Sequence, residues 1–437
     1  MPNKKFSSPS KLNLAALPGP HDTTRVVLPN GITVLVRENP GSPSVVLDGA
    51  LQAGAIYEGR ARAGLASFTA DMLKRGCAQF SFDEIYERLE AAGANLGFSS
   101  GVHTLSVGGK ALAEDLELLL ELGAAVLQAP TFPADHIERV RGEILTSLAL
   151  RAHDTRAVSA MAFYDALYGA EHPYGYEDDG YPDTVQAITA ADLRAYHAAH
   201  YGPAGMTLVI VGGVTVKAAV ALVERYFGGW KNPQQTARAA APGATAPSAP
   251  VTRRMPVAGK TQSDVVLGFL GPRRADADYQ AARVANNILG VFGMYGRLGA
   301  SVRNRAGLAY YSLSRINASF GPGTWRMLAG VNPANVDKTV KLMMREAERM
   351  TSTLVTVEEL AENQSQIIGM LPLQLESNEG VAGALASMEL FGLGLDYLQR
   401  VPGIIAALTR AELRAAAPRA GGGRPGVGIL RERNSIN

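Results

Sequence analysis

Two kinds of hydrophobic spacing alternate along the first half of the chain and predict a mixed order of strands and helices. Residues 25–38 contain two short β-rich runs around a Pro-Asn-Gly sequence, which predicts a hairpin. Further strands are predicted at 44–55, 94–111 and 204–214. Apolar residues recur at helical spacing in the segments 64–76, 81–93, 113–130, 133–153 and 215–230.

The second half repeats this order of elements. Strands are predicted at 263–272, 308–320 and 324–332, and helices at 278–290, 297–307, 335–350 and 356–371. The segment 232–255 between the halves is rich in Ala, Pro and Thr and has no periodic apolar pattern, which is typical of a linker. We therefore expect an α/β (α+β) protein of two duplicated domains, 1–231 and 256–437. Each domain is expected to pack a mixed, mainly antiparallel sheet against helices.

Composition narrows the classes of function. The chain has 437 residues with a net charge of +2, which does not favour a nucleic acid or a membrane surface as partner. Its single cysteine, Cys77, forms neither an internal disulfide nor a thiolate metal cluster. We expect no membrane span, because no apolar run is long enough. The basic start lacks the apolar core of a secretory signal, so the sequence as written predicts a cytoplasmic protein; a periplasmic chain without its leader would look the same.

Several motifs resemble one known family. They are the segment "GLASFTADMLKRG" (64–76), the "HPYG" run at His172–Gly175 and the "GLAYY" run at Gly307–Tyr311. With the hairpin sequence "LPNGITVLV", they make the chain similar to the M16 (pitrilysin-type, or inverzincin) metallopeptidases over nearly its whole length. That family includes the mitochondrial processing peptidase and the core subunits of the respiratory bc1 complex.

The resemblance implies that the metal site is lost in this chain. Active members carry His-x-x-Glu-His on the first helix, in which two histidines bind zinc and the glutamate is the general base. The matching positions here are Ser67, Ala70 and Asp71. The distal glutamate ligand falls at Ser147, and a slipped alignment would place it at Glu143 instead. We expect no metal in this half, because hydroxyls and one carboxylate do not replace two imidazoles for zinc.

A second element of the family is intact. Active members use an arginine seven residues before a tyrosine, and "SVRNRAGLAYYSL" matches with Arg303 and Tyr310. The resemblance implies that the tyrosine hydroxyl stabilises the oxyanion of the tetrahedral intermediate and that the arginine holds a substrate carbonyl. Tyr311 is adjacent, and strand alternation sends it to the opposite face from Tyr310.

For the other candidate residues, a structural role is favoured over a catalytic or metal-binding one. His197 and His200 have i, i+3 spacing on a predicted helix, but no third metal ligand is evident. His172 is expected to fix a turn, and Cys77 to be a packed small residue. The glycine-rich segment 290–299 contains no phosphate-loop pattern and predicts a turn; a glycine-rich loop of the processing peptidase lies similarly but is longer. Asp71, Glu84, Glu87 and Glu90 are expected to be solvated helix charges.

Two functional hypotheses follow. In the first, the chain is the zinc-less subunit of a heterodimeric M16-type metallopeptidase; a partner with His-x-x-Glu-His supplies zinc, and an unfolded peptide is the substrate. In the second, it is a structural or peptide-binding protein without hydrolytic activity, resembling the bc1 core subunits. A third reading, a homodimer with an unrelated metal site at His197 and His200, is less favoured.

Overall fold

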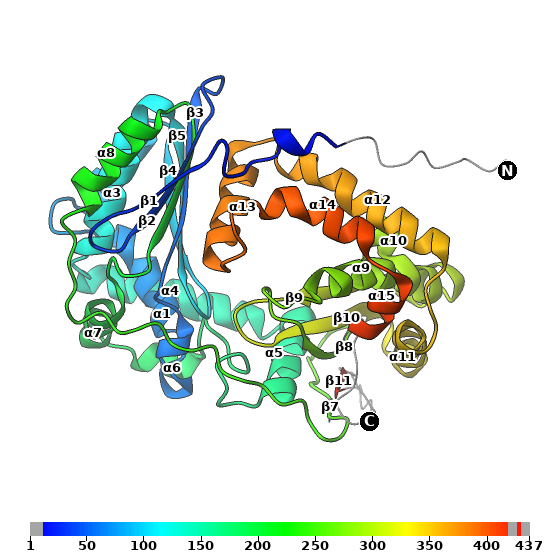
Figure 1. Cartoon of the computed structure of the whole chain (residues 1–437). Coiled ribbons are helices and arrows are strands. Elements are labelled where there is room, and N and C mark those ends of the chain that lie inside the picture. The colour runs from blue at the N-terminus through cyan, green and yellow to red at the C-terminus, as the bar shows by residue number, and fades with distance from the viewer. Residues whose placement is uncertain (1–11, 418–425, 430–437) are drawn as a thin grey trace.

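The computed structural model describes residues 12–417 and 426–429, and its strands form two separate sheets (Figure 1). The first sheet has the order β1-β2-β6-β3-β5-β4. Its strands are β1 (Thr24–Val27), β2 (Thr33–Glu38), β3 (Ser44–Leu51), β4 (Asn95–Ser100), β5 (Leu105–Leu112) and β6 (Thr207–Gly212). Only β2 and β6 pair in parallel, so this sheet is mixed and mainly antiparallel. Strand β4 lies at its edge.

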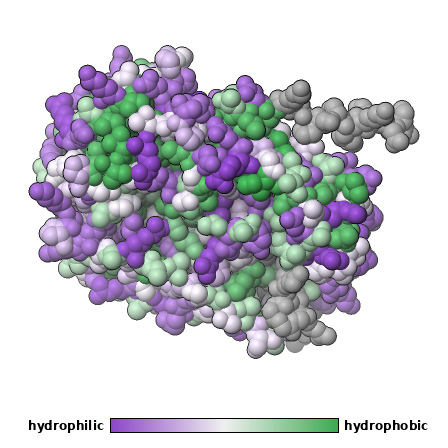
Figure 2. Space-filling model, in the orientation of Figure 1, coloured by the Kyte–Doolittle hydropathy of each residue, from purple (hydrophilic) through white to green (hydrophobic). Residues whose placement is uncertain are grey.

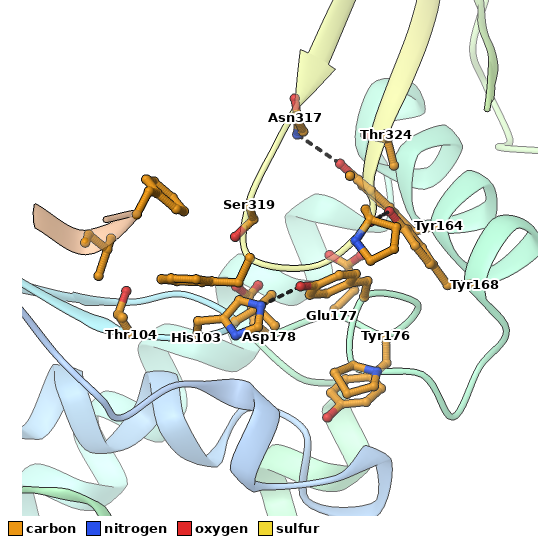
Figure 3. Close-up of a pocket in the computed structure, with 18 residues that line it drawn as sticks. His103, Thr104, Tyr164, Tyr168, Tyr176, Glu177, Asp178, Asn317, Ser319 and Thr324 are labelled. Carbon is orange, nitrogen blue, oxygen red and sulfur yellow. Dashed lines mark hydrogen bonds between the residues drawn. The ribbon is translucent and has the colours of Figure 1, made fainter. Parts of the chain in front are cut away.

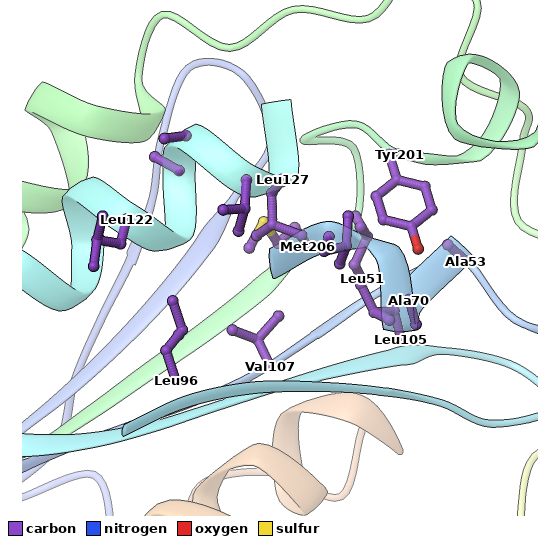
Figure 4. Packing of buried hydrophobic residues seen from close by; sticks show 14 of the residues in the cluster. Leu51, Ala53, Ala70, Leu96, Leu105, Val107, Leu122, Leu127, Tyr201 and Met206 are labelled. Carbon is purple, nitrogen blue, oxygen red and sulfur yellow. The ribbon is translucent and has the colours of Figure 1, made fainter. Parts of the chain in front are cut away.

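Helices from the first half cover one face of this sheet. They are α1 (Leu65–Met72), α2 (Phe82–Ala91), α3 (Leu116–Gln128), α4 (Ala134–Arg151), α6 (Pro182–Ala187), α7 (Ala190–His200) and α8 (Val216–Phe227). Alternate residues of the strands point into this core, such as Leu105 and Val107 of β5 (Figure 4) and Leu208 and Ile210 of β6. Their neighbours Val209 and Val211 point to the opposite face, so the central strand is apolar on both sides.

The second sheet has the order β7-β11-β8-β10-β9. Its strands are β7 (Thr252–Arg253), β8 (Ser263–Gly271), β9 (Ala309–Asn317), β10 (Gly323–Val331) and β11 (Gly426–Ile429). The accompanying helices are α9 (Tyr279–Gly290), α10 (Phe292–Leu298), α11 (Val336–Ser352), α12 (Val357–Gln374), α14 (Tyr397–Ala407) and α15 (Arg410–Ala416). This arrangement confirms the predicted fold class, two αβ units with mixed sheets and packed helices.

Two helices are exchanged between the halves. Helix α5 (Thr155–Tyr168) follows α4 in the first half but packs Phe163 and Leu167 against Val266 of β8 in the second sheet. Helix α13 (Asn378–Leu390) belongs to the second half but packs Val381 and Leu385 against the first sheet. Each sheet therefore needs the other half of the chain to cover one of its faces. The periodic pattern did not predict either helix.

The segment between the halves is attached to the surface without forming helix or strand from residue 232 to 251. The amide of Thr236 donates to the carbonyl of Ala199 at 2.8 Å, and the amide of Ala239 donates to the hydroxyl of Tyr57 at 3.0 Å. Because it has few apolar side chains to bury, hydrogen bonds rather than core packing hold it. Hydrophilic residues cover most of the face seen in Figure 2, with hydrophobic residues in smaller separate areas. None of the helices in the described part of the chain is both long and apolar enough to cross a membrane.

Candidate functional site

Helix α1 and helix α4 bring the predicted metal positions into one cavity. Helix α1 buries Leu65, Phe68 and Met72 in the core, and this leaves the other side of the helix for the cavity. The cavity has a volume of about 450 Å³ and is lined by Ser67, Ala70, Asp71, Glu143 and Ser147, among others. The positions on α1 and those on α4 are 70 to 80 residues apart in the sequence, and the fold thus brings both sets to one cavity. Both Glu143 and Ser147 face it, so either remains a candidate for the distal position.

A partly buried glutamate, Glu58, takes the place of the missing side-chain cap of α1. The helix begins after Gly64, which has φ of +96° and offers no side chain to cap the first turn. The carboxylate of Glu58 accepts from the amides of Gly64 at 3.0 Å and Ala66 at 2.6 Å. Burial raises the pKa of Glu58 to about 8 in spite of these two bonds, and the nearby Asp178 adds to the shift.

Charged side chains of both signs line the cavity at α1 and α4, called here the metal-position cavity. Partial burial raises the pKa of Asp71 to about 6, and the charges of Asp179 and Glu143 add to this, whereas Arg75 opposes it. The Ser67 hydroxyl donates to Asp179 at 3.4 Å, and Glu143 accepts from Arg75 at 3.0 Å. Glu143 is therefore already held by an arginine. Asp71 is exposed, as expected of a solvated helix charge, and the neighbouring charges perturb its pKa.

The residues present in this cavity do not fit zinc. Zinc sites in proteins use histidine, cysteine and carboxylate ligands in tetrahedral sets, and no imidazole or thiol lines this cavity. The arginine beside Glu143 and the nearby Lys74 place positive charge where a cation would bind. In the described ranges, no group of three or more His, Cys, Asp or Glu residues is arranged to hold a metal ion.

The structure also reveals a residue that the sequence did not single out. The side chain of Tyr201 is buried behind α1, and its hydroxyl is directed toward Ala70 (Figure 4). That hydroxyl has no hydrogen-bond partner among the described residues. Burial and the charge of Asp71 raise the pKa of Tyr201 far above its ordinary value, so the phenol stays protonated. Only the folded chain brings this tyrosine, 131 positions after Ala70, to the helix.

Arg303 and Tyr310 lie in the second half, away from the metal-position cavity, and neither lines it. Arg303 belongs to the π-helical turn Gly299–Arg305, which follows a kink at residues 293–296 with Gly296 at φ of +59°. The predicted glycine-rich turn is this kink. The Arg303 guanidinium contacts the sulfur of Met294, a weak acceptor.

Tyr310 is directed outward by an irregularity in β9. In the pairing with β10, Gly330 is opposite Tyr311 and Val331 is opposite Ala309, so Tyr310 is the extra residue of a β-bulge. Its side chain is 83% exposed. Tyr311 is half-buried and donates a hydrogen bond to Asp264 of β8. Tyr310 and Tyr311 therefore occupy different environments, and Tyr310 is the more accessible of the two.

The remaining candidates have structural partners. His197 Nε2 lies 2.9 Å from the carbonyl oxygen of Leu127, and His200 Nδ1 lies 2.8 Å from the hydroxyl of Thr236. His172 accepts from the amide of Tyr174 through Nδ1 at 3.0 Å, which is the expected turn. Cys77 is buried and its backbone bridges to Pro130.

Comparisons with known proteins identify relatives of this chain. Residues 33–171 match the family model described as insulinase (peptidase family M16), and residues 187–367 match the peptidase M16 inactive domain. An uncharacterised zinc protease of Streptomyces coelicolor is 26% identical over 415 residues, with 93% of this chain and 89% of that protein covered.

Solved structures show the same fold. The crystal structure of a peptidase M16 inactive domain from Pseudomonas fluorescens has a TM-score of 0.86 at 24% identity, covering 95% of this chain and 99% of that one. A protease from Helicobacter pylori also gives 0.86, at 20% identity, covering 95% of this chain and 100% of that one. The two M16 family models together match residues 33–171 and 187–367, and this protein therefore belongs to the M16 peptidase family.

Proposed function

We propose that this chain is the zinc-less subunit of a two-chain M16 metallopeptidase. The observation that carries the proposal is an asymmetry between its halves. The cavity that holds the metal positions presents Ser67, Ala70, Asp71 and Ser147, which do not suit zinc. The second half keeps an arginine and an accessible tyrosine, Arg303 and Tyr310, at the spacing that active members use.

The surroundings of Arg303 and Tyr310 support a role in hydrogen bonding to a bound peptide substrate. A bulge aims the Tyr310 side chain away from the sheet, so its hydroxyl is free to donate to an oxyanion presented from another subunit. The Arg303 guanidinium contacts the thioether of Met294, and no carboxylate of the described residues forms an ion pair with it. A weak internal partner leaves the guanidinium available for a peptide carbonyl.

The first sheet offers a place for an extended peptide. Strand β4 is at the edge, and its residues Gly97 and Phe98 line the metal-position cavity. An unfolded peptide would add as a further strand on β4 through main-chain hydrogen bonds, which makes binding tolerant of sequence. In this proposal the zinc of the partner supplies the activated water, and this chain supplies substrate contacts and the hydroxyl of Tyr310.

The test is a peptidase assay with a quenched-fluorescent peptide. This chain is measured alone, then with a cognate M16 chain that carries His-x-x-Glu-His, and zinc content is measured in each sample. We expect no hydrolysis by this chain alone and hydrolysis by the mixture above that of the zinc chain alone. Hydrolysis by the single chain with bound zinc would overturn the proposal. No gain on mixing, with peptide binding retained, would favour a structural or peptide-binding protein instead.

A further inference from the structure

A second cavity, here called the inter-half cavity, lies where the two halves of the chain meet. Its volume is about 420 Å³. Its walls come from the β4–β5 turn, the segment that follows α5, the β9–β10 hairpin and the end of α13 (Figure 3). No sequence motif connects these four segments, and the cavity is distinct from the one that holds Ser67 and Asp71.

Aromatic rings form much of its wall. They are His103, Tyr164, Tyr168, Tyr174, Tyr176, Phe320 and Phe391. The protein itself holds the tyrosine hydroxyls: Tyr168 donates to the carbonyl of Pro322 at 2.8 Å, and Tyr176 donates to that of Ala55 at 3.1 Å. The hydroxyl of Tyr174 accepts from the amide of Gly321 at 3.0 Å. Because these hydroxyls are fixed, the rings stand as walls rather than as mobile side chains.

The polar part of the lining is negative. Glu177 and Asp178 line the cavity, and no Lys or Arg does. Arg151 pairs with Glu177 at 3.3 Å and with Asp179, outside the cavity, at 3.7 Å. In the part of the chain that the structure describes, no Lys or Arg forms an ion pair with Asp178. Burial and the charge of Arg238 lower the pKa of His103 to about 4, so this histidine is neutral near pH 7 and does not offset the carboxylates.

Two further observations indicate that a cation would be accommodated. Burial raises the pKa of Glu177 and of Asp178, and neighbouring carboxylates add to both shifts, whereas the charge of Arg151 opposes them. The guanidinium of Arg238, from the segment between the halves, already lies 4.2 Å from the centre of the Phe320 ring. Arg238 does not line the cavity itself, but its contact shows that the ring of the lining residue Phe320 can hold a guanidinium.

We propose that the inter-half cavity binds a cationic side chain, the guanidinium or ammonium group of an arginine or lysine in a bound peptide. Aromatic faces attract such groups through the ring quadrupole, and Asp178 and Glu177 supply the opposite charge. The peptide as ligand rests on the proposed function. Strand β4 ends at Ser100, and the turn that follows contributes Val102, His103 and Thr104 to the cavity wall. A peptide paired with β4 would therefore pass the cavity with one of its side chains.

The experiment measures binding to this chain without any partner subunit. Two fluorescein-labelled peptides of Ala, Ser and Gln residues are compared by anisotropy, one with a central arginine and the other with citrulline. Citrulline keeps the shape of arginine and lacks its charge. We expect the arginine peptide to bind roughly tenfold more tightly, and Asp178→Asn to remove most of that preference. Glu171→Gln, which removes an exposed carboxylate of the same loop outside the lining, should retain it.

A second variant keeps the proposal open to refutation if Asp178→Asn does not fold. Phe320→Leu retains apolar volume and removes a ring, so it should weaken the arginine peptide more than the citrulline peptide. Equal binding of the two peptides to the unaltered chain would overturn the proposal, as would an undiminished preference in a folded Asp178→Asn or Phe320→Leu variant. The assay involves no turnover. Charge-selective binding without activity on mixing would therefore refute only the two-chain peptidase, and activity without charge selectivity would refute only this site.

Discussion

The hydroxyl of Tyr311 donates a hydrogen bond to Asp264, whose side chain is almost wholly buried in β8. Asp264 also accepts from the hydroxyl of Thr155, at the start of α5, and Arg156 lies 3.8 Å from it. The carboxylate therefore ties the strand that carries Tyr310 to the helix contributed by the other half. Through this contact the exchange of helices between halves fixes the strand position from which Tyr310 projects.

The first prediction concerns Tyr310. In the complex with a zinc-bearing partner, Tyr310→Phe should lower kcat by about 10²–10³-fold, because one oxyanion donor is removed. Peptide affinity and the melting temperature should change little, since the side chain is exposed. Tyr226→Phe, which removes a hydroxyl on α8, is the matched control and should leave turnover intact. Unchanged turnover in Tyr310→Phe would refute the assigned role.

The second prediction separates Tyr311 from its neighbour. Tyr311→Phe leaves the buried carboxylate of Asp264 with one donor fewer, so it should lower the free energy of unfolding by about 1–3 kcal/mol. Tyr310→Phe should not. Urea denaturation followed by circular dichroism measures both. Equal stability of Tyr311→Phe and the unaltered chain would mean that the contact between Tyr311 and Asp264 adds nothing to the fold.

The third prediction uses the unpaired hydroxyl of Tyr201. Tyr201→Phe removes a buried polar group that has no partner among the described residues, so the free energy of unfolding should stay the same or rise by up to roughly 1 kcal/mol. Tyr176→Phe, which breaks a hydrogen bond to the carbonyl of Ala55, is the contrasting variant and should be destabilising. A clear loss of stability in Tyr201→Phe would show that the hydroxyl is satisfied in solution.

The fourth prediction concerns pH. Asp71 should titrate near pH 6, measured by NMR of its side-chain carboxyl carbon, and Asp179→Asn should lower that midpoint by removing a neighbouring charge. Because the pKa is raised on folding, the folded chain holds an extra proton between the ordinary value and about 6. The contribution of Asp71 to stability is therefore present at low pH and is lost as the pH rises through that interval. Asp71→Asn should make the free energy of unfolding less dependent on pH in this interval. A titration midpoint of Asp71 near the ordinary value of an aspartate would contradict the prediction.

The local pattern of the chain was sufficient to predict most strands and helices of both sheets. Periodicity indicates which residues of a segment face a core, so segments such as β6 and α8 could be identified without a structure. The motif frames placed Ser67, Ala70, Asp71 and Ser147 as equivalent positions, and the fold brought them to one cavity. The periodic pattern did not predict helix α13, and even a clear apolar stripe shows only that a helix is covered, not which sheet covers it.

What the sequence by itself determined, then, was the order of the elements, the likeness to M16 peptidases and the residue types at the metal positions. The tertiary structure alone decided which half covers which sheet, that Tyr310 projects from a bulge while Tyr311 is anchored, and that Asp178 lies among aromatic rings. The physical reason is the range of the interactions. Hydrophobic spacing and capping act over a few residues, whereas a cavity, a hydrogen bond to Asp264 or a perturbed carboxyl depends on groups that only folding brings together.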